Sequence, residues 1–472
     1  MKKLICIAMC AVLLSSCHIY RKYERPEGLP VDSLFRGAES YTTDDTLTLG
    51  DLSWEEVFQD TLLQNLIRFG LDNNTDLQTA LLRVDQAKSQ LTAARLAFLP
   101  SLTLSPQGTV SSTDGAKAVK SYEIPVQASW EIDLFGNLLN AARGSRSTLL
   151  QQEAYRQAVQ SELIATIAND YYSLLMLDEQ IGLSRSTLEL WREQVRIMES
   201  LLKVGEETEN AVTQARANLY ELEATHNDLL RQQREAENAL CTVLGVTPRP
   251  IERGVLAGQQ FPEIFNVGVP LRLLSKRPDV REAEMTLASA YYTTNQARSA
   301  FYPNLTLSGS AGWTNALGQV VTNPGGWILS AVASLTQPIF NRGKLVSNLR
   351  VSKDEEQIAL LNYKQTLLDA GQEVSDALYA VESAQRNLDI HQKQCRELER
   401  TVETSTALYK TGNATYLELL TAQQSLLNAR LNMVSDSFTH CQAIITLYRA
   451  LGVVATDRGD DCHRFFSVRY FQ

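Results

Sequence analysis

Residues 80–100 read ALLRVDQAKSQLTAARLAFLP, and residues 283–303 read AEMTLASAYYTTNQARSAFYP. Both segments carry alanine at every seventh position and both end in Ala-Arg-x2-Phe-x-Pro. A second correspondence follows in the same order, because Lys203-Val204-Gly205 returns as Lys410-Thr411-Gly412. Solenoid repeats are only about 20–50 residues long. Here the matching segments are 203 and 207 residues apart. This spacing is too long for a solenoid and therefore indicates a duplication, with two structurally equivalent halves.

The duplication predicts the division of the chain. The halves are separated by a stretch rich in proline and glycine, which we interpret as a linker. The expected segments are a signal peptide at 1–16, a lipid-anchored N-terminal segment at 17–60, the first half at 61–248, the linker at 249–269, the second half at 270–455 and a tail at 456–472.

Each half opens with a helix. Apolar residues at positions 80, 84, 87, 91 and 94 are spaced alternately by four and three, which is a heptad seam. Much of the seam is alanine, and small side chains let helices approach closely. Pro100 and Pro303 are expected to end the two helices, because proline cannot continue the hydrogen-bond ladder.

The period then changes to two. From Tyr122 to Leu134, apolar and polar residues alternate strictly, which predicts a strand with one apolar and one polar face. Leu102 and Leu104 begin a shorter partner strand, and the second half offers strands at 305–313 and 327–336. Such strands with aromatic ends are typical of an outer-membrane barrel, although a soluble hairpin packed on a core remains open.

Four strands per chain require an oligomer if they lie in lipid. A sheet with open edges would leave unsatisfied backbone groups in the hydrocarbon, each costing several kcal/mol. Bacterial barrels have at least about eight strands. At least two chains must then share one barrel, and the strand count does not choose between two and three.

Long helical regions follow the strands, at about 137–203 and 343–410. After a glycine turn, each returns as a helix of ~34 residues, or ~50 Å at 1.5 Å per residue. Polar residues in the returning seams, such as Gln233 and Asp436, predict a hollow or partly wet assembly. A compact soluble bundle is the alternative.

The N-terminus predicts export. Lys2-Lys3 precede an apolar run from Leu4 to Leu14, and Leu14-Ser15-Ser16-Cys17 resembles the bacterial lipobox. Cys17 is then the lipidated first residue of the mature chain. An ordinary secretion signal is the alternative. No later run of 18 apolar residues exists, so no membrane-spanning helix is expected in the mature chain.

Composition and motifs give no sign of an enzyme. The net charge of −10 disfavours a nucleic-acid partner. The five histidines lack metal-ligand spacing, no phosphate-binding loop is present, and Ser308-Gly309-Ser310 falls within strand-like alternation. We expect no catalytic residue, no metal and no cofactor except the lipid on Cys17. Four further cysteines are expected to be buried or free thiols: Cys241, Cys395, Cys441 and Cys462.

Several short motifs resemble one known family. They are Arg277-Pro278-Asp279, Gln337-Pro338-Ile339-Phe340-x2-Gly343, Tyr409-x2-Gly412 and Cys17-x2-Tyr20-x2-Tyr23-x2-Pro26. In this order and spacing, over nearly the whole chain, they resemble the TolC/OprM family of outer-membrane efflux lipoproteins.

The resemblance implies a mainly α-helical homotrimer with a shared 12-stranded transmembrane barrel and a tunnel of long helical hairpins. It implies a lipid-anchored protein of the outer membrane with a large periplasmic part. The expected partners are outer-membrane lipid, a periplasmic adaptor and an inner-membrane RND pump. The implied function is a passive exit duct gated at the hairpin tips. Two alternatives remain: the outer component of an ABC-driven type I secretion system, and a structural coiled-coil lipoprotein. The exported substrate is not predicted.

The resemblance also assigns candidate site residues. Gly205 and Gly412 match the glycines of the two hairpin turns, where positive φ is required. Glu418 falls where the family often places an aspartate at the closed aperture, and a ring of three carboxylates would favour cations. Thr421 occupies a second position that is acidic in some members, which leaves the aperture charge in doubt. A solvated helix residue is the alternative for Glu418. The candidates for adaptor contact are Lys203, Val204, Lys410 and Thr411, beside the two glycines.

Overall fold

The computed structural model describes residues 20–27, 52–112, 114–115, 118–259, 261–262, 277–315 and 325–452. The predicted signal peptide, the lipidation site Cys17, the C-terminal tail and Cys462 lie outside the described residues. So does part of the predicted linker.

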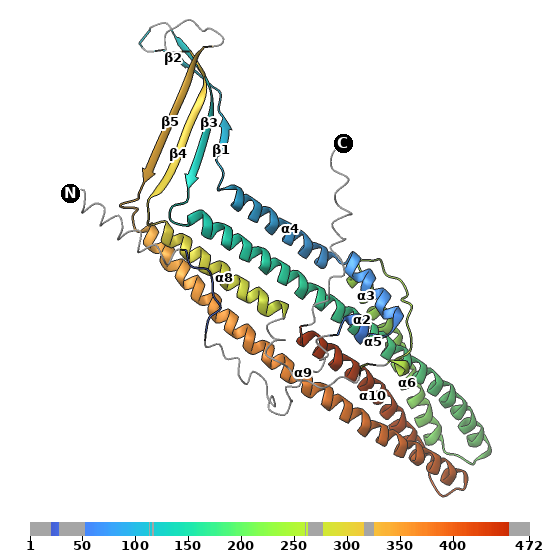
Figure 1. Cartoon of the computed structure of the whole chain (residues 1–472). Coiled ribbons are helices and arrows are strands. Elements are labelled where there is room, and N and C mark those ends of the chain that lie inside the picture. Colours follow the sequence, from blue (N-terminus) through green and yellow to red (C-terminus); the bar gives the residue numbers. More distant parts are fainter. Residues whose placement is uncertain are drawn as a thin grey trace. The chain divides into compact units, whose positions relative to one another are not determined.

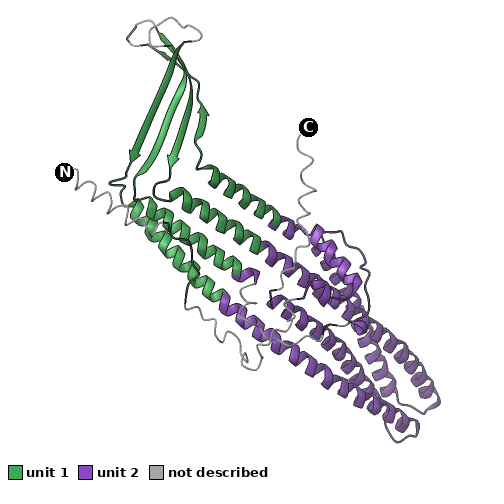
Figure 2. Cartoon of the chain, in the orientation of Figure 1, with its two compact units in different colours: residues 1–29, 81–155, 281–366 green, residues 30–80, 156–280, 367–472 purple. Residues whose placement is uncertain are grey.

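The chain forms two compact units, shown in different colours in Figure 2. Unit 1 comprises residues 1–29, 81–155 and 281–366, and unit 2 comprises residues 30–80, 156–280 and 367–472. Each unit takes segments from both halves of the sequence repeat. The duplicated halves are therefore not themselves the compact units.

Unit 1 contains one antiparallel sheet (Figure 1). Its order is β1-β3-β4-β5, with β2 also paired to β3. The strands are β1 (Ser101–Leu104), β2 (Gln107–Ser111), β3 (Val119–Ile132), β4 (Asn304–Thr314) and β5 (Gly326–Thr336). The hairpin-like pairs of the two sequence halves meet where β3 pairs with β4.

The predicted shorter partner strand is divided in two. β1 pairs with residues 126–129 of β3, and β2 pairs with residues 119–123. Between them lies Pro106, which has no N–H to donate to the sheet. The four expected strands thus occupy four positions in the sheet, with one position shared by β1 and β2.

The pairing of the strands places apolar residues opposite apolar residues and polar residues opposite polar residues. On one face Ile124 lies opposite Trp313 and Val126 opposite Ala311, whereas on the other Gln127 lies opposite Ser310. The rings of Trp313 and Trp327, on β4 and β5, have centroids 4.8 Å apart. The alternation in the sequence therefore predicted the two faces of the sheet correctly.

One helix in each half leads directly into the strands. These helices are α4 (Thr75–Leu96) and α8 (Pro278–Ser299). Both end shortly before the prolines expected to end them, Pro100 and Pro303. The predicted seam of α4 is buried at Ala80, Val84, Ala87 and Leu91, so it packs as the spacing indicated.

The long helices form two hairpins. α5 (Asn137–Val204) returns as α6 (Glu209–Val243), and α9 (Lys344–Lys410) returns as α10 (Tyr416–Ala450). These bounds lie within about two residues of those predicted. Among the described residues, no helix is long and apolar enough to cross a membrane. Two short helices, α2 (Trp54–Val57) and α3 (Thr61–Asn73), and a 3-10 turn η4 (Leu256–Gly258) complete unit 2.

Both hairpins contribute to one apolar core within unit 2. The residues come from α5, α6 and α10 and occupy the helical turns nearest the two hairpin loops. They are Leu188, Trp191, Val195, Met198, Val212, Ala215, Leu219, Leu222, Tyr416, Leu420 and Leu427. Burial of such side chains stabilises the packed state by about 1.5–3 kcal/mol each relative to exposure.

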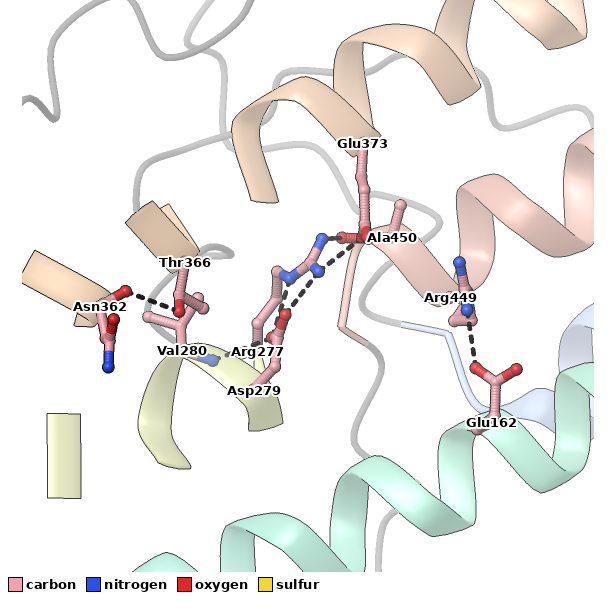
Figure 3. A network of polar contacts seen from close by, with 9 residues as sticks. All are labelled: Glu162, Arg277, Asp279, Val280, Asn362, Thr366, Glu373, Arg449 and Ala450. Atoms are coloured by element: carbon pink, nitrogen blue, oxygen red, sulfur yellow. Dashed lines mark hydrogen bonds and ion pairs between the residues drawn. The ribbon is translucent and has the colours of Figure 1, made fainter. Parts of the chain in front are cut away.

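Arg277 of the Arg-Pro-Asp motif has a structural role (Figure 3). Its guanidinium donates to the carbonyl oxygen of Ala450 at 2.7 Å and to the carboxylates of Asp279 and Glu373, also at 2.7 Å. The residue is only 5% exposed. A buried cation without these partners would be strongly destabilising. Arg277 therefore joins the start of α8 to α9 and to the last turn of α10.

Candidate functional site

The two hairpin turns are built alike. Gly205 has φ +82° and Gly412 has φ +72°. The N–H of Gly205 donates to the carbonyl of Leu202, and that of Gly412 to the carbonyl of Tyr409. Such left-handed residues satisfy the last carbonyls of a helix and end it. The prediction of positive φ at both glycines is confirmed.

Side chains beside the glycines are accessible. Lys203, Val204, Lys410 and Thr411 are all exposed, and Val204 has 71% of its surface exposed. These four residues are therefore free to serve as the predicted contacts.

Glu418 helps to begin α10. Its carboxylate accepts a hydrogen bond from the backbone N–H of Thr415 at 3.1 Å, while the Thr415 hydroxyl accepts from the N–H of Glu418 at 3.3 Å. This reciprocal pair is a capping box. The side chain is nonetheless exposed. Thr421, one turn later, donates its hydroxyl to the carbonyl of Leu417. In the first hairpin Thr208 caps α6 alone, because Ala211 takes the position of Glu418.

A contact between the two turns was not predicted. The phenol of Tyr409, in the last turn of α9, donates to the carboxylate of Glu207 at 2.5 Å. The Tyr409 ring also packs edge-on against Tyr416, with centroids 5.9 Å apart. Burial, together with the hydrogen bond to Glu207, raises the pKa of Tyr409. We call the Tyr409–Glu207 pair the turn latch.

The turn latch was only partly foreseeable from the sequence. Glu206, Glu207 and Glu209 form an acidic group beside the first turn in the sequence. Tyr409 belongs to the Tyr409-x2-Gly412 motif, but neither pattern indicates which side chains meet. The structure leaves Glu206 and Glu209 exposed and half-buries Glu207 against the second hairpin. Of these three glutamates, Glu207 is the one whose carboxylate accepts the hydrogen bond from Tyr409.

Ion pairs join the helices within each hairpin. In the first, Arg192 of α5 pairs with Glu223 of α6 at 2.8 Å. In the second, Glu399 of α9 pairs with Arg430 of α10 at 2.6 Å. By the repeat that aligns Gly205 with Gly412, Glu399 takes the position of Arg192, and Arg430 takes that of Glu223. The same contact is therefore made with its charges exchanged.

Further along the hairpins, polar residues have structural partners. The Nδ1 atom of His226 lies 2.8 Å from the hydroxyl of Ser184, and Cys241, Cys395 and Cys441 are free and buried. In the described part of the chain, no group of three or more His, Cys, Asp or Glu side chains is arranged to hold a metal ion.

The N-terminal segment is attached to unit 1. Arg25 forms an ion pair with Glu284 of α8 at 2.6 Å. The backbone N–H of Tyr23 donates to the hydroxyl of Tyr292 on the same helix. Arg143 of α5 donates to the carbonyl of Tyr20. The chain is therefore held in place within a few residues of Cys17.

Comparison with known proteins agrees with this architecture. The family model "Outer membrane efflux protein" matches residues 66–246 and 269–453. The chain is 28% identical to the probable outer membrane lipoprotein SilC of Salmonella typhimurium, over 95% of this chain and 98% of the relative. It is 27% identical to the cation efflux system protein CusC of Escherichia coli K12, over 94% and 97% of the two chains.

A solved structure gives the same result. The open state of the MtrE outer membrane channel of Neisseria gonorrhoeae superposes with a TM-score of 0.83 at 28% identity, over 92% of this chain and 98% of that chain. These relatives are described as channel or efflux proteins, not as enzymes. The chain belongs to the outer membrane efflux protein family and is an outer-membrane channel with a large periplasmic part.

Proposed function

We propose that this chain is the exit duct of a tripartite efflux system driven by an inner-membrane RND pump. Three copies would share one barrel and one helical tunnel, and the duct itself would conduct passively. The sheet of unit 1 is the observation that carries this proposal. Its described strands end in an edge at β5 and another at β1 and β2. Pairing of these edges between copies would satisfy both in lipid.

The lipid anchor fits the same assembly. Acylation of Cys17 would tether each copy, and the contacts of Tyr20, Tyr23 and Arg25 hold the following segment against unit 1. Several acyl chains together bind a membrane durably, because each buried methylene contributes about 0.8 kcal/mol. Replacing Cys17 with alanine is expected to abolish incorporation of labelled palmitate.

The hairpin turns would receive a periplasmic adaptor. Lys203, Val204, Lys410 and Thr411 offer exposed contacts there. Capture of partners from membranes distinguishes the candidate systems. An RND pump with its adaptor would support the proposal, whereas an ABC transporter would assign the chain to type I secretion.

The turn latch is proposed as the closing contact of the tip. Opening must separate the two hairpins, and the Tyr409–Glu207 hydrogen bond joins them at their ends. A hydrogen bond to a charged group is worth about 1.5–3 kcal/mol. Its loss would shift the closed-to-open equilibrium about tenfold or more, since 1.4 kcal/mol corresponds to a factor of ten. Glu418 would add carboxylates near the same aperture in addition to capping α10.

Single-channel recording in planar bilayers tests the latch. Tyr409→Phe keeps the ring against Tyr416 and removes only the donor, so it should raise the open probability about tenfold. Glu207→Gln should do the same or less. Tyr220→Phe is the matched control, because Tyr220 is 63% exposed on α6. An open probability unchanged in Tyr409→Phe contradicts the latch. A wild-type protein that is monomeric and forms no channel contradicts the exit duct.

A further inference from the structure

The two faces of the sheet in unit 1 differ in chemistry. One carries Ile124, Trp130, Trp327 and Leu329, and Leu329 is 85% exposed in the single chain. The other carries mainly small hydroxyl and amide groups, among them Ser310 and Ser330, whose hydroxyls are 2.7 Å apart. In an outer-membrane barrel the apolar face meets lipid and the polar face lines the interior. The hydroxyl-bearing face is therefore the wall of the bore.

Charge on the polar face is sparse. Among the described strand residues, only Lys120, Glu123 and Glu131 are charged, and all three belong to β3. Strand alternation puts Glu123 and Glu131 on the face of Gln127, and Lys120 on the face of Ile124. The polar face between the two glutamates is neutral in β1, β3, β4 and β5.

Neighbouring strands hold both carboxylates along this face. Gln107 of β2, directly opposite Glu123, donates its amide to Glu123 at 2.9 Å. Asn304, the first residue of β4, donates its amide to Glu131 at 3.0 Å. Neutral amide partners position a carboxylate without cancelling its charge. Each glutamate thus presents a fixed negative charge to the bore.

The separation of the two glutamates is close to the height of the apolar band of an outer-membrane barrel. They are eight positions apart on one strand, or roughly 27 Å along the strand at about 3.4 Å per residue. Barrel strands tilt by about 35–45°, so the separation along the barrel axis is about 19–22 Å, and the apolar band of such a barrel is about 25 Å tall. Glu123 and Glu131 therefore fall near the two ends of the membrane-embedded part of the bore.

We propose that Glu123 and Glu131 from the assembled copies form two acidic rings in the barrel, which make the barrel itself favour cations over anions. This inference rests on the proposed shared barrel. The rings act by their field on passing ions, and no ion needs to bind. Because they are further apart than the screening length of about 8–10 Å at physiological salt, they act almost independently. Selectivity is then set in the barrel as well as at the periplasmic aperture.

Reversal potentials across planar bilayers in a KCl gradient test the rings. Glu123→Gln and Glu131→Gln keep the size and hydrogen-bonding capacity of the side chains and remove the charge. Each should lower the potassium-to-chloride permeability ratio about twofold at 0.1 M salt, and much less at 1 M, because screening weakens the field. The double variant should show approximately the product of the two effects. Conversely, Gln127→Glu adds a third ring and should raise the ratio.

Lys120→Gln is the matched control, since it removes a charge from the opposite face of the same strand and should leave the ratio unchanged. Trimers resistant to dissociation in mild detergent show that each variant has assembled. If the double variant conducts with the wild-type ratio, the acidic rings are refuted while the exit duct stands. If wild-type protein forms no channel, it is the proposed function that fails.

Discussion

At single positions, the backbone conformation and the contacts of the side chain determine which residue type is required. Gly205 and Gly412 have open space where a Cβ would lie, so crowding does not demand glycine there. Positive φ demands it, because a Cβ in the left-handed region costs about 1–2 kcal/mol. Glu418 shows the converse, since a residue expected to act at an aperture also has a structural contact, the cap of α10.

Asp170, on α5, carries a prediction about pH. Burial raises its pKa from 3.8 to about 6. The folded state therefore prefers the protonated carboxyl, and the ionised form destabilises it. This penalty is absent below pH 3.8, grows as the pH rises from 3.8 to about 6, and is complete above that. Asp170→Asn should remove it, raising the unfolding free energy at pH 7.5 by about 1–2 kcal/mol per chain, less than full burial would give because the side chain is partly open to solvent.

Thermal unfolding across pH measures this effect. The melting temperatures of wild type and Asp170→Asn should coincide near pH 4, separate up to about pH 6 and then run parallel. The exposed Asp72, replaced by asparagine, serves as the control. If the difference between the two melting temperatures is already at its full size at pH 4, the asparagine stabilises through packing, independently of charge.

Between helices, the two halves of the repeat preserve an attraction between opposite charges, although the residues that carry the charges differ. Arg192–Glu223 in the first hairpin and Glu399–Arg430 in the second are the same contact with opposite polarity. Either order gives the same attraction between two partly exposed side chains. Such pairs typically contribute about 0.2–1 kcal/mol, so each adds little to the stability of its hairpin.

A double-mutant cycle should show that the two charges of the Arg192–Glu223 pair can be exchanged. Arg192→Glu places two carboxylates together and should lower the melting temperature by about 1 °C, because a change of up to about 1 kcal/mol is spread over a long chain. Adding Glu223→Arg reproduces the polarity of the second hairpin and should restore most of the loss, with a coupling of about 0.5 kcal/mol. If the double variant lowers the melting temperature by the sum of the two single effects, the two side chains do not interact in the assembled protein.

At the scale of the whole molecule, the faces of β5 determine how copies can assemble. Leu329 and Ser330 are neighbours on opposite faces. Leu329→Arg would place a charge against lipid, at a cost of about 2–4 kcal/mol near the membrane midplane. Ser330→Arg would place the same charge in the aqueous bore.

Outer-membrane fractionation tests this difference. Leu329→Arg should sharply reduce the trimer recovered from outer membranes, whereas Ser330→Arg should assemble with altered conductance. The reverse result would exchange the two faces of the sheet, and would overturn the acidic rings together with this prediction.

Most helices and strands were predictable from the sequence. Heptad and alternating periods predicted the long helices, β4 and β5 within about two residues and β3 within three, because each period follows from local backbone geometry. The helices α2 and α3 and the break between β1 and β2 were not predicted. The repeat showed that Gly205 and Gly412 are equivalent, and the family resemblance assigned them to the hairpin turns, where positive φ is required and is found. The strand at Ser308-Gly309-Ser310 was also predicted from alternation alone.

Contacts between groups distant in the sequence became visible in the folded chain. Glu207 reaches Tyr409, and Arg277 reaches both Glu373 and Ala450, across long stretches of sequence. Likewise, the compact units mix segments of both repeats. A periodic pattern states which side of an element is apolar, but it does not state which other element covers that side. The partner is chosen by packing of the whole chain, so the turn latch and the buried arginine could not be predicted from local sequence.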